Sequence, residues 1–209
     1  MIEYFYPNID DYNLIYEKYP DNQQEILEYL MKELKIDPEE YQKEVSRIQD
    51  ISWEEREVTF FLIPKGAPRP RSGNWNHVYV KGAKELKRVF QRFLHMEGII
   101  CTRTEFDLEC YLPTPITGMT NMEIALAEGK EIRPLVMPDY DNLGKNYTDA
   151  LQGVLLLNDN IICDGRIKKY YSIKPRIKIR IQYQTDFDCK YNQNKVEKSI
   201  SYKKFFGLE

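Results

Sequence analysis

The sequence contains few of the residues on which thiol and zinc chemistry depend. Its 209 residues include only four cysteines and two histidines. No C-x-x-C pair occurs, and His77 and His95 do not lie at zinc-finger spacing from any cysteine. These absences argue against a structural zinc site. We expect four reduced thiols, mostly buried, at Cys101, Cys110, Cys163 and Cys189.

Long hydrophobic runs are also absent. No apolar run approaches the roughly 18 residues that a membrane-spanning helix needs. The first residues, Met1-Ile2-Glu3-Tyr4-Phe5, lack the basic-then-apolar layout of a signal peptide. We therefore expect a cytoplasmic protein with no membrane partner. The composition, with 42% hydrophobic and 30% charged residues, is that of an ordinary globular chain long enough for one good core.

An overall excess of positive charge is missing, since the net charge is −3. This value alone argues against nucleic-acid binding, but the charges are unevenly distributed. The N-terminal quarter is rich in acids, and the segment that follows is rich in cations. The cations are Lys65, Arg69, Arg71, Lys81, Lys84, Lys87, Arg88, Arg92 and Arg103. Such asymmetry indicates a nucleic-acid-binding surface beside an acidic extension.

The stretch from Met137 to Lys145 predicts the start of a helix. Pro138 disfavours the helical region for the residue before it and carries no N–H, so the helix should begin just after it. Apolar residues then recur at helical spacing on one face, at Leu143, Tyr147, Ala150, Leu151 and Val154. Asp141, Lys145 and Asp149 follow at i, i+4 and i+8, so they form a second, polar face.

Carboxylates gather around this predicted helix. Asp139 lies two residues before Asp141 and can point to the same side, and Asp159 follows the helix in Asn158-Asp159-Asn160. With Lys145, the pattern predicts three carboxylates and one ammonium around a single point. Hard oxygen ligands of this kind suit Mg²⁺ or Mn²⁺.

Two simpler interpretations compete with a metal site. An aspartate before a helix is often only a cap, which satisfies free N–H groups at the helix start. A calcium-binding EF-hand loop would also use Asp139, Asp141 and Gly144, at its positions 1, 3 and 6. Leu143 and Ala150 then fall where ligands belong, so the EF-hand interpretation fails.

Further residues extend the pattern of Asp139-Tyr140-Asp141-Asn142-Leu143-Gly144-Lys145, namely Asp149-Ala150-Leu151, Asn158-Asp159 and Lys169. Together they resemble the signature of the RusA-type Holliday-junction resolvases, crossover junction endodeoxyribonucleases of phages, prophages and bacteria. The resemblance runs from about Val58 to Tyr183, and its specific part ends at Asp159. It implies a metal-dependent, dimeric enzyme that cuts branched DNA.

The resemblance also implies roles for individual residues. Asp139, Asp141 and Asp159 would be the catalytic, metal-binding acids, and Lys145 the essential basic residue. Asn142 and Asp149 would support them. The chain departs from the family pattern at Asn158-Asp159, where two adjacent acids are common, and this departure leaves the number of bound ions open.

Basic residues outside this block are candidates for DNA binding. The Pro- and Gly-rich loop that carries Lys65, Arg69 and Arg71 can follow a phosphate backbone, or it can be merely solvated. Lys84, Lys168 and Lys169 are further candidates. Trp75, His77 and Tyr79 can stack on exposed bases or pack inward from a short β-ribbon.

The remaining pattern predicts the secondary structure. Residues 22–50 read as two helices of an α-hairpin, and residues 83–96 as an amphipathic helix with Leu86, Val89, Phe90 and Phe93 towards the core. Residues 58–64 read as a strand buried on both faces, and residues 106–112 as an alternating strand.

A connection over 114–133 contains a short helical piece and is either a flap over DNA or a tolerated insertion. Residues 167–173 and 177–183 read as a β-hairpin with a basic outer face.

These elements predict an α+β fold, a mixed β-sheet with helices packed on it, preceded by an N-terminal α-hairpin. The expected organisation is a helical extension over 1–56, a RusA-like endonuclease domain over 57–185, and a polar tail over 186–209 with a docked Phe205-Phe206.

The preferred function is a Mg²⁺-dependent endodeoxyribonuclease that resolves Holliday junctions in DNA recombination and repair. It is expected to act as a homodimer, because a four-way junction offers two equivalent strands to cut. The alternatives are a catalytically silent branched-DNA-binding protein of the same fold and a flap or other structure-selective nuclease. A phosphotransfer or nucleotide-hydrolysing enzyme would want a Gly-rich phosphate loop, and no G-x-x-x-x-G-K sequence occurs.

Overall fold

The chain forms two compact units, one of residues Met1–Ile51 with Asp188–Glu209 and the other of Ser52–Phe187. The structure, a computed structural model, describes residues 22–67, 71–72, 78–79, 83–94 and 98–185. The predicted tail over 186–209, with Phe205-Phe206, lies outside the described residues, as do Arg69, Trp75 and His77.

The described part of the first unit consists of two helices, α2 (Gln23–Glu33) and α3 (Pro38–Gln49), as the sequence predicts. Each begins at a side-chain cap. Asn22 accepts a hydrogen bond from Glu25 N–H at 2.9 Å, and Asp37 accepts one from Glu39 N–H at 2.9 Å. Pro38 takes the first helical position, where its missing N–H has no cost.

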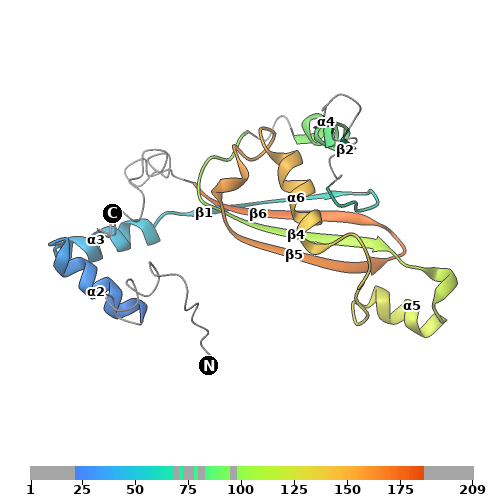
Figure 1. Ribbon diagram of the computed structural model, residues 1–209, viewed down its shortest axis with the longest axis horizontal. Helices are drawn as coiled ribbons and strands as arrows, with labels where there is room; N and C mark the ends of the chain where they lie inside the picture. Colours follow the sequence, from blue (N-terminus) through green and yellow to red (C-terminus); the bar gives the residue numbers. More distant parts are fainter. Residues whose placement is uncertain (1–21, 68–70, 73–77, 80–82, 95–97, 186–209) are drawn as a thin grey trace. The chain divides into compact units, whose positions relative to one another are not determined.

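The second unit is built on a four-stranded mixed sheet with the order β1-β6-β4-β5 (Figure 1). The strands are β1 (Trp53–Phe60), β4 (Thr104–Pro113), β5 (Ile162–Ser172) and β6 (Arg176–Gln184). β4 and β5 are parallel, and β6 is antiparallel to both of its neighbours. A small ribbon pairs β2 (Arg71–Ser72) with β3 (Val78–Tyr79). The predicted α+β class with a mixed sheet is confirmed.

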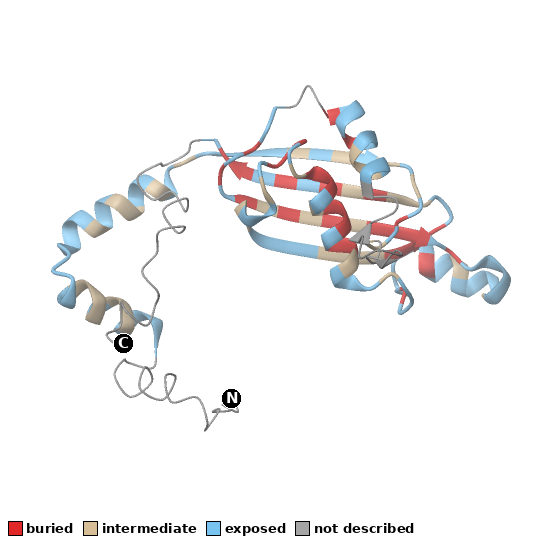
Figure 2. Ribbon diagram, turned by 45° about the horizontal axis from the view of Figure 1, so that its top comes forward, coloured by how far each residue is buried: buried red, intermediate tan, exposed pale blue. Residues whose placement is uncertain are grey.

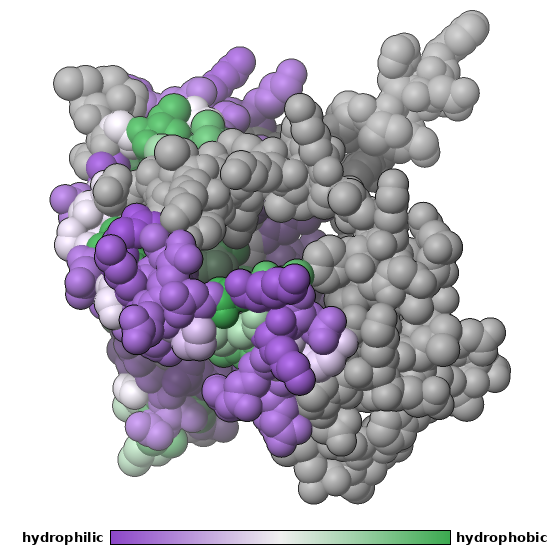
Figure 3. Space-filling model, turned by 90° about the vertical axis from the view of Figure 1, so that its left-hand side faces the viewer, coloured by the Kyte–Doolittle hydropathy of each residue, from purple (hydrophilic) through white to green (hydrophobic). Residues whose placement is uncertain are grey.

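Two helices, α4 (Ala83–Leu94) and α6 (Tyr140–Leu151), contribute to the core on one side of the sheet. Phe90 of α4, Tyr147 of α6 and Ile179 of β6 are almost fully buried there, and Figure 2 shows this buried layer running along the central strands. Contrary to expectation, Val89 and Phe93 of α4 are 39% and 65% exposed. Most of the described surface visible in Figure 3 is hydrophilic.

The predicted hairpin of the last two strands is wrong. β5 and β6 follow each other closely in the chain, but β4 lies between them and pairs with both. Strands on either side of a third are only about 10 Å apart, and three or four extended residues cover that distance. The short link around Pro175 is therefore long enough either to join two adjacent strands in a hairpin or to connect two strands that have a third between them.

The first strand also differs from the prediction. β1 begins at Trp53, earlier than expected, and ends at Phe60. Within the described residues it is an edge strand paired with β6. Its residues are exposed or half-buried along its whole length, so it is not buried on both faces. Phe61 and Ile63, which were assigned to the strand, follow it and are 67% and 56% exposed.

The long connection between β4 and α6 contains η1 (Ile116–Gly118) and α5 (Asn121–Glu128), the latter close to the predicted helical piece. A capping box of Thr120 and Glu123 starts α5. At its other end, the Glu128 carboxylate accepts hydrogen bonds from Ser172 Oγ and Ile173 N–H, both at 2.9 Å. These bonds fasten α5 to the link between β5 and β6.

Two simple expectations are tested directly. Within the described residues, no helix is long and apolar enough to cross a membrane. The described cysteines are free, but Cys101 and Cys163 are exposed and only Cys110 is buried, so the expectation of mostly buried thiols is wrong for them. Burial raises the pKa of the Cys110 thiol to about 12, so it stays protonated.

Candidate active site at the start of helix α6

Helix α6 begins where the sequence predicts, directly after Pro138. Asp139 occupies the N-cap position, but its side chain makes no capping hydrogen bond. Asp139 and Asp141 are both exposed. Because the Asp139 carboxylate does not satisfy the N–H groups of the helix, capping alone does not account for it.

A close contact with the sheet fixes the position of α6. A Cβ atom added to Gly144 would lie 2.5 Å from Cδ1 of Ile167 on β5, nearer than real Cβ atoms come. Leu143 beside it is fully buried. The glycine between the two acids and the lysine therefore leaves room for the end of the Ile167 side chain under the helix. Sequence reasoning missed this role, although an isolated glycine in a helical pattern is a signal for such packing.

Lys169 of β5 holds the chain just before α6. Its Nζ donates hydrogen bonds to the carbonyl oxygens of Val136 at 2.6 Å and of Pro138 at 3.0 Å. Predicted as a DNA-binding residue, Lys169 thus uses its ammonium to position the segment that leads to Asp139. Its contribution to DNA binding stays a prediction.

The basic loop begins against the same end of α6. Ala67 N–H donates to the Asn142 carbonyl at 2.9 Å, and Lys65 N–H donates to Tyr147 Oη at 3.1 Å. Asn146 Nδ2 donates to the Lys65 carbonyl at 2.9 Å. Burial raises the pKa of the Tyr147 hydroxyl, which therefore remains neutral. The described start of this loop, residues 65–67, is thus fastened beside the acids, with the Lys65 side chain exposed.

The predicted polar face of α6 is present. Asp141, Lys145 and Asp149 are all exposed. Within the described part of the chain, none of these side chains takes part in an ion pair. Asn142, predicted to support the site, is half-buried, and its backbone carbonyl is the one that binds the loop.

Asp159 lies at the other end of α6. It is the first residue of η2 (Asp159–Ile161), which directly precedes β5. The first residue of β5 aligns with Thr104 of β4. Lys169, which holds the start of α6, aligns with Cys110 further along β4. Seven residues of strand correspond to about 23 Å, and the 12 residues of α6 to about 18 Å. Figure 1 shows the helix running back along the sheet between these two places.

The fit of a divalent metal can therefore be tested. The three carboxylates are exposed, and oxygen donors are what Mg²⁺ and Mn²⁺ prefer. However, among the described residues of one chain, no three acids, histidines or cysteines lie close enough to hold a metal ion. The three carboxylates are donors of the right chemical type for the ion, but the described residues of a single chain do not bring all three to one point. The assignment of the three ligands stays a prediction.

The face of the sheet opposite to α6, here called the open face, is not the basic surface that was predicted. Lys168 Nζ lies 3.6 Å from Asp107 and 3.8 Å from Glu109, and Lys178 Nζ lies 2.9 Å from Glu57. The Lys178 hydrogen bond is the main cause that lowers the pKa of the Glu57 carboxyl. Neighbouring strands supply acids opposite the cations, a cross-strand pairing that a single strand's sequence does not reveal.

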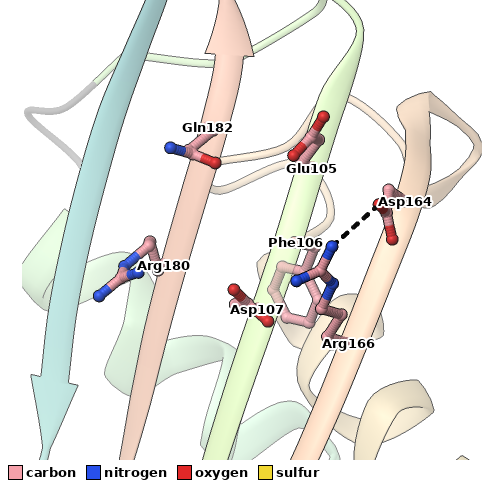
Figure 4. A pocket seen from close by; sticks show the side chains of 7 residues that line it. All are labelled: Glu105, Phe106, Asp107, Asp164, Arg166, Arg180 and Gln182. Carbon is pink, nitrogen blue, oxygen red and sulfur yellow. Dashed lines mark ion pairs between the residues drawn. The ribbon is translucent and has the colours of Figure 1, made fainter.

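A shallow pocket on the open face has the same mixed charge (Figure 4). Arg166 and Asp164, both on β5, pair at 3.7 Å on one side of the pocket, and Glu105, Asp107, Arg180 and Gln182 complete the polar lining. Of the other DNA-binding candidates, Lys84 is exposed on the first turn of α4, and Arg71 lies in β2.

Comparison with known proteins identifies the class. The family model described as "Endodeoxyribonuclease RusA" matches residues 62–182, more than half of the chain. The protein belongs to the RusA endodeoxyribonuclease family, which confirms the resemblance seen in the sequence.

One curated relative is the "Uncharacterized protein YqaN" of Bacillus subtilis (strain 168). It is 31% identical to this chain over 87 residues, which make up 41% of this chain and 61% of that protein. The chain thus matches less than two thirds of that relative's length.

Proposed function

We propose that the protein is a Mg²⁺-dependent endodeoxyribonuclease that resolves four-way DNA junctions in recombination and repair. Membership of the RusA family supports this function. The observation that carries it is local: exposed carboxylates and a lysine, none of which forms an ion pair within the described residues, stand at the start of α6, beside the fastened start of the basic loop. The family match supports a nuclease domain over 57–185, in a bacterial or phage protein of the cytoplasm.

The proposed mechanism assigns each polar group a task. Asp139 and Asp141 would hold Mg²⁺, with Mn²⁺ as a possible substitute. When bound, such an ion supplies hydroxide near neutral pH and stabilises negative charge on the phosphate. Lys145, one turn along the exposed face, would place a fixed positive charge beside the leaving oxygen. The loop from Lys65 to Arg71 would contact the backbone and orient the scissile phosphate.

A homodimer is part of the proposal, because it can bring Asp159 to the site. Within one chain Asp159 and Asp139 belong to opposite ends of α6. In a two-fold dimer, Asp159 of one copy can meet Asp139 and Asp141 of the other, and the two sites then match the two-fold symmetry of the junction.

Mixing two inactive variants tests this shared site. The Asp139→Asn/Asp141→Asn double variant and the Asp159→Asn variant should each be inactive alone. If ligands come from both copies, mixed dimers contain one complete site and should nick junctions. If Asp159 serves its own chain, no mixed dimer has a complete site and cutting stays absent. Size exclusion with light scattering measures whether dimers form at all.

A substrate panel tests the activity itself. Labelled four-way junctions, flaps, duplex and single strands are incubated with Mg²⁺ and with EDTA. The proposal expects Mg²⁺-dependent cutting of the junction in preference to the others. Binding without cutting would favour the silent DNA-binding protein, and preferred cutting of flaps would favour a different structure-selective nuclease.

A further inference from the structure

Three cations surround a pair of buried tyrosines at one end of the open face. Tyr111 of β4 and Tyr170 of β5 are neighbours in the register, and their rings stack with centroids 5.1 Å apart. The Arg176 guanidinium lies 3.6 Å from the Tyr111 ring centroid. Lys130 Nζ lies 4.6 Å and the Arg133 guanidinium 4.2 Å from the Tyr170 ring centroid. We call Lys130, Arg133 and Arg176 over these two rings the basic platform.

The cations of the platform differ from the others on the same face. Lys168, Lys178 and Arg180 are paired with acids from neighbouring strands. In the part of the chain that the structure describes, no ion pair involves a platform cation. Of the nearby acids, Glu109 accepts a hydrogen bond from Tyr111 Oη at 2.7 Å, and Glu128 is occupied by Ser172 and Ile173.

The platform is held in place before any ligand binds. Arg176 Nη1 donates to Ser172 Oγ at 3.1 Å and to the Lys174 carbonyl at 3.0 Å, and Arg133 Nε donates to the Lys130 carbonyl at 3.1 Å. Lys130 has a left-handed backbone (φ 69°), a conformation at a helix end that usually takes glycine. The two arginines, fixed in this way, lose little freedom on binding, and Lys130 and Arg133 remain exposed.

The platform lies close to the candidate active site along the chain. Arg133 precedes Asp139 by six residues, which span at most about 21 Å. That distance corresponds to about six base-pair steps of duplex DNA. Lys169, the residue after Tyr170, holds the Pro138 carbonyl. The segment from Lys130 to Pro138 therefore passes from the tyrosine rings to the start of α6 along edge strand β5.

We infer that the basic platform binds the phosphate backbone of the DNA arm that carries the scissile phosphate. The inference rests on the proposed function and extends the DNA-contacting surface beyond the loop at Lys65. Its chemistry is charge complementarity: cations that form no ion pair within the described residues face a polyanion. The Tyr111 hydroxyl contributes more than Glu109 to the raised pKa of Lys130. The arginines keep N–H donors for phosphate oxygens.

Salt dependence of junction binding tests the inference. The Lys130→Gln/Arg133→Gln variant is titrated against a labelled four-way junction in EDTA, so that no cutting occurs, between 50 and 200 mM salt. Each lost phosphate contact should reduce the slope of log K against log salt by about 0.9, so this pair should reduce it by about 1.8. The matched control is Lys178→Gln/Arg180→Gln, which removes two paired cations from the same face and should leave the slope unchanged.

A charge-keeping variant separates charge from packing over the tyrosines. Lys130→Arg/Arg133→Lys should keep the wild-type slope, and circular dichroism and melting show whether each variant folds. Suppose that the wild type binds junctions and that the glutamine variant reduces the salt slope no more than the control does. The inference that the basic platform binds DNA is then wrong, and the proposed function stands. If the wild type binds no DNA, both fail.

Discussion

Two regions of the molecule hold charged side chains in opposite ways. On the open face, acids and cations from adjacent strands are paired, as in Lys178–Glu57 at 2.9 Å. At the start of α6, Asp139, Asp141 and Lys145 are exposed, and none has an ion pair within the described part of the chain. Both regions are rich in charge, so composition does not separate them.

The difference is consistent with the proposed position of the active site at the start of α6. Paired surface charges contribute little to stability and are neutralised locally. Exposed charges that form no ion pair within the described residues, such as Asp139 and Asp141, add no paired interaction to the fold and remain available to a cation or substrate. The comparison therefore supports the proposal that the chemistry lies at the α6 end, and the paired charges are expected to have a structural role.

Removing the acids should have the largest effect. Asp141→Asn should abolish junction cutting while leaving junction binding in EDTA intact, because less negative charge near DNA does not hinder binding. The matched control is Glu57→Gln, an acid of the paired region, which should cut at the wild-type rate. Equal activity of the two variants in a gel-based cleavage assay would contradict the comparison.

Lys145→Ala should have the next largest effect. If Lys145 stabilises charge in the transition state, turnover should fall by roughly 10²–10³ while junction affinity changes little. Single-turnover cleavage with saturating protein measures turnover apart from binding. Lys178→Ala, which removes a paired lysine, serves as control. A loss confined to affinity would make Lys145 a binding residue.

Gly144→Ala should disturb the support of the site. Its Cβ would meet Ile167 Cδ1 at 2.5 Å. Because this atom is the end of a flexible side chain that can turn away, the expected loss of stability is at or below the lower end of the about 1–3 kcal/mol that overpacking costs. Urea unfolding measures the loss. Gly118→Ala, where nothing lies within 4 Å of the new Cβ, should be far milder. Adding Ile167→Ala should relieve the clash. If the stability losses of the two single variants simply add in the double variant, the clash is excluded.

The paired region should respond to pH only weakly. The pKa of Glu57 is lowered from its ordinary value of 4.5, mainly by the hydrogen bond with Lys178. A lowered pKa stabilises the fold above the ordinary value, and this contribution is lost as pH falls through the lowered value. Because Glu57 is solvent-exposed, the effect should be small. The urea concentration at the midpoint of unfolding should therefore fall less between pH 5 and pH 3 in Glu57→Gln than in the wild type.

The sequence predicted α6 well because its information is local. Leu143, Tyr147, Ala150 and Leu151 recur at helical spacing, and all four are buried. Cross-strand relations were not accessible in the same way. The insertion of β4 between β5 and β6 and the acids opposite Lys178 depend on residues far away in the chain.

Candidate-site residues followed the same division. The start of α6 at Pro138 and its exposed polar face were predictable from spacing. The position of Asp159 was not predictable from spacing. It depends on the turns over residues 152–158 and on η2, which keep the chain at the end of α6 away from Asp139 until β5 begins. Lys130 and Arg133 come from a connection and Arg176 is the first residue of β6, so no periodic pattern draws attention to them.

A supercoiled plasmid that extrudes a cruciform tests the central claim most directly. With Mg²⁺, the account predicts paired cuts within one binding event, so linear plasmid should appear without prior accumulation of nicked circles. EDTA and Asp141→Asn should each leave the plasmid supercoiled. Nicked circles alone, or cutting that persists in EDTA or in Asp141→Asn, would contradict a metal-dependent resolvase at the start of α6.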